Sequence, residues 1–188
     1  WFLPYAVASG NTYVVKPSSQ VPCTMAKIAE LIDEAGFPKG VINIVTGSRD
    51  VSNALLESPD VVGISMVGST RFCEELAQRC AKVNKRFQAM GSAKNHLVVM
   101  PDAKMDDVVR NMITSGYGCA GQRCLAVSLA VTVGEARNSF NEMICDVASS
   151  RVVGNGLDAD VQMGPVISQA SKENIERLIS MGTTEGAT

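Results

Sequence analysis

Cys124 lies in a glycine-rich segment whose composition could make its thiol a nucleophile. The run from Gly116 to Cys124 contains three glycines, and Arg123 is the immediate neighbour of the cysteine. The thiolate is the reactive form, and nearby cations or backbone N–H groups stabilise it. Glycines allow the backbone to approach such a group closely. The pattern therefore indicates a catalytic cysteine, while a buried structural cysteine remains the alternative.

The other thiols and the single histidine are weaker candidates for chemistry. Cys119 shares the glycine-rich segment, whereas the remaining four cysteines fall in expected helices or turns. His96 stands at the start of an expected strand, so a structural role is favoured over a Cys–His pair. With no C-x-x-C pair and one histidine, ligands at the usual zinc spacing are missing. Reduced thiols in an intracellular compartment are expected.

The glycines at positions 116, 118 and 121 also match the G-x-G-x-x-G pattern of dinucleotide-binding proteins. In that motif a strand precedes the first glycine, and a helix that follows the last one points at the pyrophosphate. Here a helix is expected before the glycines, and no acidic residue lies about 20 positions further on. The spacing therefore does not favour a dinucleotide site in this segment.

Two other short segments suit a nucleotide better, because each follows an expected strand. Lys16 begins one of them, and Gly68 and Ser69 form the other. Ligands of open parallel sheets bind beyond the carboxyl ends of the strands, and helix N-termini attract phosphate. Lys16 could reach ribose hydroxyls or a phosphate. The alternative is a solvated lysine and two ordinary turns.

A locally basic region could contact the phosphates of a cofactor, although a solvated helix face is favoured. It comprises Arg71, Arg79, Lys82, Lys85, Arg86 and Lys94.

Strands and helices alternate along the first half of the chain. Apolar and β-branched runs predict strands at 12–16, 41–45 and 61–65, and helical periodicity predicts helices at 26–35, 50–56 and 71–82. This alternation is typical of a parallel sheet covered on both faces.

The second half is expected to continue as α/β. Strands are expected at 96–100 and 128–133, with helices at 106–114, at 136–150 and from the Ser168 cap to 179. The segment between 151 and 164 is expected to be a loop.

Composition excludes several classes of protein. The 188 residues are 46% hydrophobic and 19% charged, which is unlike a disordered chain. The formal net charge of −2 argues against a general nucleic-acid binder. No apolar run approaches the roughly 20 residues that span a bilayer, so no membrane partner is expected. Because the chain begins Trp1-Phe2-Leu3-Pro4 without Met, we expect an internal fragment of a longer protein.

Short motifs occur along nearly the whole chain, at Ala8–Thr12, Val15–Ser18, Gly36–Asn43, Val67–Thr70, Ala93–His96, Val99–Ala103, Gly121–Cys124 and Met163–Pro165. Together they resemble the aldehyde dehydrogenase superfamily, and within it the CoA-acylating methylmalonate-semialdehyde dehydrogenase branch. The resemblance implies an α/β fold with a Rossmann-type parallel sheet. It implies part of the NAD-binding domain at 1–91 and part of the α/β catalytic domain at 92–188.

The resemblance also implies roles for individual residues. Cys124 matches the nucleophile that attacks the aldehyde carbon, and Arg123 matches an arginine that binds the substrate carboxylate. Cofactor-binding positions are matched by Lys16, Ser19, Gln20, Gly68, Ser69 and Gly91. Gly91 belongs to the segment that crosses from the cofactor domain to the catalytic domain. The implied partners are a small aldehyde, NAD and CoA, and the implied assembly is a homo-dimer or homo-tetramer.

Ser19 departs from the family pattern, in which a glutamate binds the 2′-OH of the adenosine ribose. Without that carboxylate, a 2′-phosphate meets less repulsion, so use of NADP beside NAD is a hypothesis.

A second departure concerns release of the product. Hydrolytic members of the superfamily use a glutamate to activate water, and it would fall between Phe87 and Lys94. No Asp or Glu occurs between Glu75 and Asp102. Thiols attack thioesters with less help from a base. Transfer to CoA is therefore expected, and the resemblance implies propionyl-CoA or acetyl-CoA as the product, with loss of CO2.

Two alternatives remain: a hydrolytic aldehyde dehydrogenase that forms a free acid, and a non-catalytic nucleotide-binding module with a structural Cys124. The branch further implies a role in valine catabolism, in mitochondria of eukaryotes or the cytoplasm of bacteria. Mitochondria are preferred.

Overall fold

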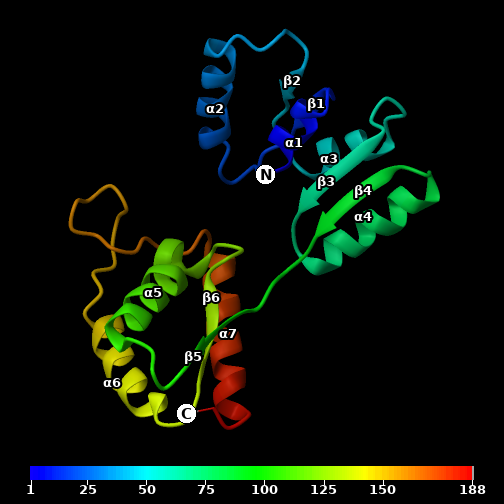
Figure 1. The fold of residues 1–188 in the computed structure, drawn as a ribbon. Helices are drawn as coiled ribbons and strands as arrows, with labels where there is room; N and C mark the ends of the chain where they lie inside the picture. Colours follow the sequence, from blue (N-terminus) through cyan, green and yellow to red (C-terminus); the bar gives the residue numbers. More distant parts are fainter. Residues whose placement is uncertain (188) are drawn as a thin grey trace. The chain divides into compact units, whose positions relative to one another are not determined.

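The computed structural model describes residues 1–187 and divides into two compact units, Trp1–Ser92 and Ala93–Thr188. Figure 1 shows the chain coloured along its sequence. The sequence places the domain boundary after residue 91. The assignment of a cofactor role to the first unit and a catalytic role to the second stays a prediction. None of the helices among the described residues is both long and apolar enough to cross a membrane.

The first unit alternates helices with parallel strands, which confirms the α/β class. The strands form two parallel pairs, β1 with β2 and β3 with β4. Its elements are α1 (Phe2–Ala8), β1 (Tyr13–Val15), α2 (Cys23–Glu34), β2 (Ile42–Ile44), α3 (Arg49–Glu57), β3 (Gly63–Val67), α4 (Thr70–Lys82) and β4 (Arg86–Met90).

A small apolar core holds α3 and α4 against the β3–β4 pair. The residues Leu56, Leu76 and Cys80 are buried at its centre, and Cys80 has no exposed surface. Partly buried residues of the two strands pack around them, namely Ile64, Met66 and Ala89. Burial of apolar surface of this kind is the main force that fixes a helix on a sheet. The core therefore sets where α4 begins relative to the ends of β3 and β4.

Two elements of the first unit were not expected from the sequence. The α1 helix includes Pro4, which a first helical turn tolerates because its N–H has no intrahelical partner there. The β4 strand, Arg-Phe-Gln-Ala-Met, has no β-branched residue, so its local propensity is weak. It pairs in register with β3, from Gly63 opposite Arg86 to Val67 opposite Met90. Tertiary pairing, rather than propensity, thus forms this strand.

The second unit contains one parallel pair, β5 with β6, joined through α5. Figure 1 shows α5 and α6 lying beside these strands. Its elements are β5 (Asn95–Val99), α5 (Met105–Tyr117), an irregular turn (Gly118–Gly121), β6 (Val127–Thr132), α6 (Ala136–Ser149) and α7 (Gln169–Thr184). The expected strands and helices of this half are confirmed, and α7 extends five residues beyond the expected end at 179.

The core of the second unit lies between α5, α6 and β5. Its buried members are Val99, Val109, Ile113, Ala136 and Phe140. Asp106 and Asp107 occupy the first turn of α5, where carboxylates interact favourably with the helix dipole. The α5 helix packs in this core and contacts β6, and the glycine-rich segment starts from its C-terminal end.

Candidate active site

The glycine-rich segment leaves α5 through an unusual backbone turn. Cys119 and Ala120 have φ values of 52° and 53°, in the left-handed region that non-glycine residues rarely adopt. A Cβ on Gly116 would lie 3.1 Å from the carbonyl oxygen of Val127, and one on Gly121 would lie 2.9 Å from that of Gly116. The segment therefore folds back on itself through close backbone contacts that only glycine permits at these two positions. Strained non-glycine residues of this kind often accompany functional sites.

Cys124 is exposed to solvent immediately after this turn. Its carbonyl oxygen accepts a hydrogen bond of 2.8 Å from Nδ2 of Asn95, at the start of β5. Cys119, in the same segment, is also exposed, as are Cys23 and Cys145. Exposure alone therefore does not single out Cys124. Its position on a segment braced against β5 distinguishes it from the thiols in helices.

The Arg123 side chain turns toward the end of α5. Its Nη2 donates hydrogen bonds to the carbonyl oxygens of Thr114, at 2.7 Å, and Ser115, at 3.0 Å. The last carbonyls of a helix have no intrahelical partners, and arginine is a common donor to them. A Cβ on Gly118 would collide with the same guanidinium. Arg123 therefore anchors the turn. Among residues 1–187 both of these bonds use Nη2, and the guanidinium carries further N–H donors on Nη1 and Nε.

Gln122 is a bracing residue that was not selected from the sequence. Its Nε2 donates to the carbonyl oxygen of Cys119 at 3.0 Å, and its Oε1 accepts from the backbone N–H of Ile167 at 2.8 Å. The side chain thus ties the turn to the residues that precede α7. A spacing of 45 residues between partners leaves no local signal that could have indicated this contact.

The His96 ring makes a local contact near the start of β5. Its Nδ1 lies 3.0 Å from the carbonyl oxygen of Lys94. No hydrogen bond between His96 and Cys124 occurs in the part of the chain that the structure describes.

Lys16 is half-buried where the loops after β1 and β2 meet. Its Nζ donates to the carbonyl oxygens of Pro17, at 2.9 Å, and Gly47, at 3.3 Å. It thus lies beyond the carboxyl ends of two parallel strands, as the sequence predicts. Ser19 and Gln20 form an exposed turn next to it, in which the N–H of Gln20 donates to Oγ of Ser18.

The structure brings Gly68, Ser69 and Gly91 together at the carboxyl ends of β3 and β4. Ser69 caps α4, because its hydroxyl accepts a hydrogen bond from the N–H of Phe72. The N–H of Gly68 donates to the carbonyl oxygen of Met90 at 3.1 Å. A Cβ on Gly91 would lie 3.0 Å from Oγ1 of Thr70, so the chain after β4 passes directly beside the start of α4. This is the arrangement in which a helix N-terminus can receive a phosphate.

Two members of the basic region are bound by neighbouring groups, whereas Arg71, Lys82, Arg86 and Lys94 are exposed, as in the solvated face that the sequence favours. Lys85 donates to the carbonyl oxygens of Leu56, at 2.6 Å, and Ser58, at 2.8 Å. Arg79 binds the Asn53 carboxamide at 2.7 Å and the Glu57 carboxylate at 3.0 Å. Both side chains therefore tie α3 to its neighbours, and their charges are already engaged.

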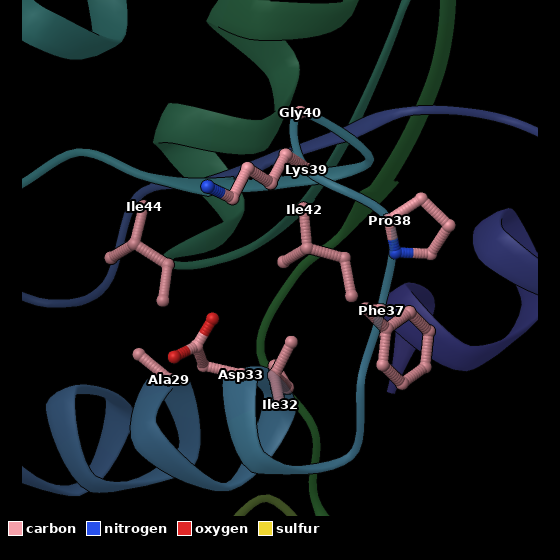
Figure 2. Close-up of a pocket in the computed structure, with 9 residues that line it drawn as sticks. All are labelled: Ala29, Ile32, Asp33, Phe37, Pro38, Lys39, Gly40, Ile42 and Ile44. Atoms are coloured by element: carbon pink, nitrogen blue, oxygen red, sulfur yellow. The ribbon is translucent and has the colours of Figure 1, made fainter.

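An open cavity of about 340 Å³ lies between α2 and β2. Figure 2 shows Ile42 and Ile44 of β2 directed toward Ala29 and Ile32 of α2, with the Asp33 carboxylate beside them. None of the site residues expected from the sequence lines it. The cavity therefore does not include Lys16, Gly68 or Ser69, the cofactor positions expected in the same unit.

Comparison with known proteins identifies the family. The model of the aldehyde dehydrogenase family matches residues 1–188. A malonate-semialdehyde dehydrogenase of Halalkalibacterium halodurans is 46% identical over 188 residues, which are the whole of this chain and 39% of that protein. This chain thus spans about two fifths of that relative's length.

Solved structures agree with the sequence comparison. A methylmalonate-semialdehyde dehydrogenase from Oceanimonas doudoroffii is 38% identical with a TM-score of 0.92, over 99% of this chain and 38% of that one. An NAD-dependent aldehyde dehydrogenase from Sinorhizobium meliloti is 32% identical, also with a TM-score of 0.92, over 98% of this chain and 37% of that one. In sequence and in fold, the chain belongs to the aldehyde dehydrogenase family.

Proposed function

We propose that this chain forms part of an NAD-dependent dehydrogenase that oxidises malonate semialdehyde or methylmalonate semialdehyde with CoA as acyl acceptor. The observation that supports it most is the exposed Cys124 on a turn anchored to the end of α5 and to β5. The relatives named above support the substrate class, since two of them are called malonate- or methylmalonate-semialdehyde dehydrogenases.

The residues of the first unit fit a dinucleotide. Lys16 Nζ has three protons and gives two to carbonyl oxygens, so the third is left for a ribose hydroxyl. The N-terminus of α4, capped by Ser69, provides free N–H groups for a pyrophosphate. NAD bound there would accept the hydride from the substrate. The protein's own contribution is to hold the ribose and the phosphates.

At Cys124 the thiolate attacks the aldehyde carbon and forms a thiohemiacetal. Loss of hydride from that carbon leaves a thioester on Cys124. A CoA thiolate then displaces the Cys124 sulfur, and the β-carboxylate is lost as CO2. For malonate semialdehyde the balance is one semialdehyde, one NAD⁺ and one CoA giving acetyl-CoA, CO2 and NADH. Arg123, through donors other than Nη2, would orient the carboxylate of the semialdehyde.

The proposed transfer to CoA rests on the absence of a carboxylate base. The stretch between Glu75 and Asp102 covers the end of α4 and all of β4 and β5, and it contains no Asp or Glu. Water needs a general base to attack a thioester, whereas a thiol is partly ionised near neutral pH.

Product analysis of the full-length protein tests this proposal. With malonate semialdehyde and NAD, sustained NADH formation is expected only when CoA is added, with acetyl-CoA as product. Multiple turnovers to a free acid without CoA would favour the hydrolytic alternative. If neither condition gives NADH and iodoacetamide labels Cys124 no faster than Cys23 or Cys145, the chain is a non-catalytic nucleotide-binding module.

A further inference from the structure

The start of β6 contains a β-bulge directly after the Cys124 turn. Asn95 pairs with Val127 and His96 pairs with Leu129, so Ser128 is an extra residue on β6. The Ser128 hydroxyl accepts from the N–H of Asn95 at 3.0 Å and donates to the carbonyl oxygen of Asn95 at 3.3 Å. Both main-chain groups of Asn95 are therefore satisfied by one side chain. Bulges next to active sites often redirect a side chain.

At this bulge the Asn95 carboxamide binds the Cys124 turn. Its Nδ2 lies 2.8 Å from the carbonyl oxygen of Cys124 and 2.8 Å from that of Ala126. A carboxamide nitrogen has two protons, and each finds a carbonyl here. The N–H of Ala126 in turn donates to the carbonyl oxygen of Arg123 at 3.0 Å. Cys124 thus lies inside a tight turn whose open side is closed by Asn95.

We infer that Asn95 is a positioning residue that fixes the backbone of Cys124 to the start of β5. The inference rests on the proposed function, because it assumes that the Cys124 thiol is the nucleophile. Asn95 does not need to touch the substrate. It acts through the Cys124 carbonyl oxygen, and a displacement of about 1 Å at a reacting atom can cost about 100-fold in rate.

The donors, rather than the size of the side chain, carry this role. In Asn95→Asp an isosteric carboxylate would face the carbonyl oxygens of Cys124 and Ala126, with no proton to donate. Asn95→Gln keeps both protons on a side chain one methylene longer. If Asn95 had a purely structural role, both variants would be less stable, but kcat would not fall selectively relative to KM.

Steady-state kinetics of the full-length protein distinguish these roles. Asn95→Asp is expected to lower kcat about 10- to 100-fold, with KM for NAD and for the semialdehyde within about twofold of wild type. Asn95→Gln is expected to retain more kcat than Asn95→Ala. The matched control is Asn43→Asp, because the Asn43 carboxamide also donates to a backbone carbonyl, that of Gly40 at 2.8 Å, in the other unit. This control is expected to keep the wild-type kcat.

The inference is overturned if Asn95→Asp keeps the wild-type kcat, or if its kcat falls no further than that of Asn43→Asp. Should Asn95→Asp fail to fold, equal kcat values for Asn95→Gln and Asn95→Ala would overturn it, and a higher value for Asn95→Gln would support it. Failure of the proposed function has a different signature. In that case the wild-type protein forms no NADH, or Cys124→Ser remains active.

Discussion

Cys80 and Cys124 place the same side chain in two contrasting settings. Cys80 lies in α4 with no exposed surface, inside the core of the first unit. Burial raises the pKa of the Cys80 thiol, and the nearby Lys85 and Arg79 only partly oppose that rise. Cys124 is exposed on a turn of the second unit, with its carbonyl oxygen hydrogen-bonded to Asn95. A thiol therefore becomes a candidate nucleophile when its residue is exposed on a hydrogen-bonded turn, and the residue type alone is not sufficient.

The largest expected effect separates the two thiols by activity. Cys124→Ser should lower NADH formation by the full-length protein by roughly 1,000-fold or more, because the nucleophile itself is lost. Cys80→Ala should leave kcat within a few-fold of wild type, since the Cys80 side chain only fills core volume. The measurement is steady-state NADH production with malonate semialdehyde. Comparable losses in both variants would remove the functional distinction between the two cysteines.

The second-largest effect is expected at Arg123, the proposed partner of the substrate carboxylate beside Cys124. Arg123→Leu should raise KM for malonate semialdehyde about 10- to 100-fold more than KM for propanal, because propanal has no carboxylate to bind. The measurement is a comparison of kcat and KM for the two aldehydes. If kcat/KM fell equally for the two aldehydes and the Tm were lower, Arg123 would have only a structural role, through its hydrogen bonds to Thr114 and Ser115.

The third prediction concerns the effect of the buried Cys80 thiol on stability as the pH changes. A thiol with a raised pKa in the folded state stabilises the fold below the unfolded thiol pKa of about 8.5. That stabilisation is lost as the pH rises from the pKa of the unfolded thiol through the higher pKa of the folded thiol. The free energy of unfolding of the wild type should therefore fall above about pH 8.5, by at most about 1.4 kcal/mol per pH unit from this group.

Urea unfolding at several pH values between 7 and about 10.5 measures this effect. Cys80→Ala provides the control, because this variant has no ionisable thiol at position 80. If the two proteins lose stability in parallel over this range, the burial of Cys80 does not govern its ionisation.

The smallest expected effect lies in the exposed turn beside Lys16. The full-length protein should turn over NADP as well as NAD, because Ser19 presents no carboxylate to a 2′-phosphate. Ser19→Glu should lower kcat/KM for NADP about threefold relative to NAD, a modest effect because exposed charges interact weakly. No turnover of millimolar NADP by the wild type would remove this expectation.

Much of the fold was predictable because its signals are local. The strand at Tyr13–Val15 is rich in β-branched residues, and the α4 helix has the periodicity of an amphipathic segment. By contrast, β4 is formed by pairing with β3 and has little propensity of its own. The sequence could not indicate that dependence, because register is a property of two distant segments.

The same distinction holds at the candidate site. Cys124 and Lys16 could be selected from their residue types and neighbours. The side-chain bonds of Asn95 and Gln122 could not, because they depend on the bulge at Ser128 and on the left-handed backbone of Cys119. The hydrogen bonds from Arg123 to the end of α5 likewise depend on how the turn folds back. Three-dimensional placement, rather than composition, decides these contacts.

The strand pairs have a practical consequence for a polypeptide of these 188 residues. Among the described residues each strand has one hydrogen-bonded partner, so every pair leaves two open edges. Two-stranded sheets are marginal in water, and open edges are templates for pairing with other chains. Exposed apolar side chains such as Val14 and Val98 stand on these same strands. A polypeptide of this length produced alone is therefore expected to aggregate as its concentration rises, and light scattering during refolding would record it.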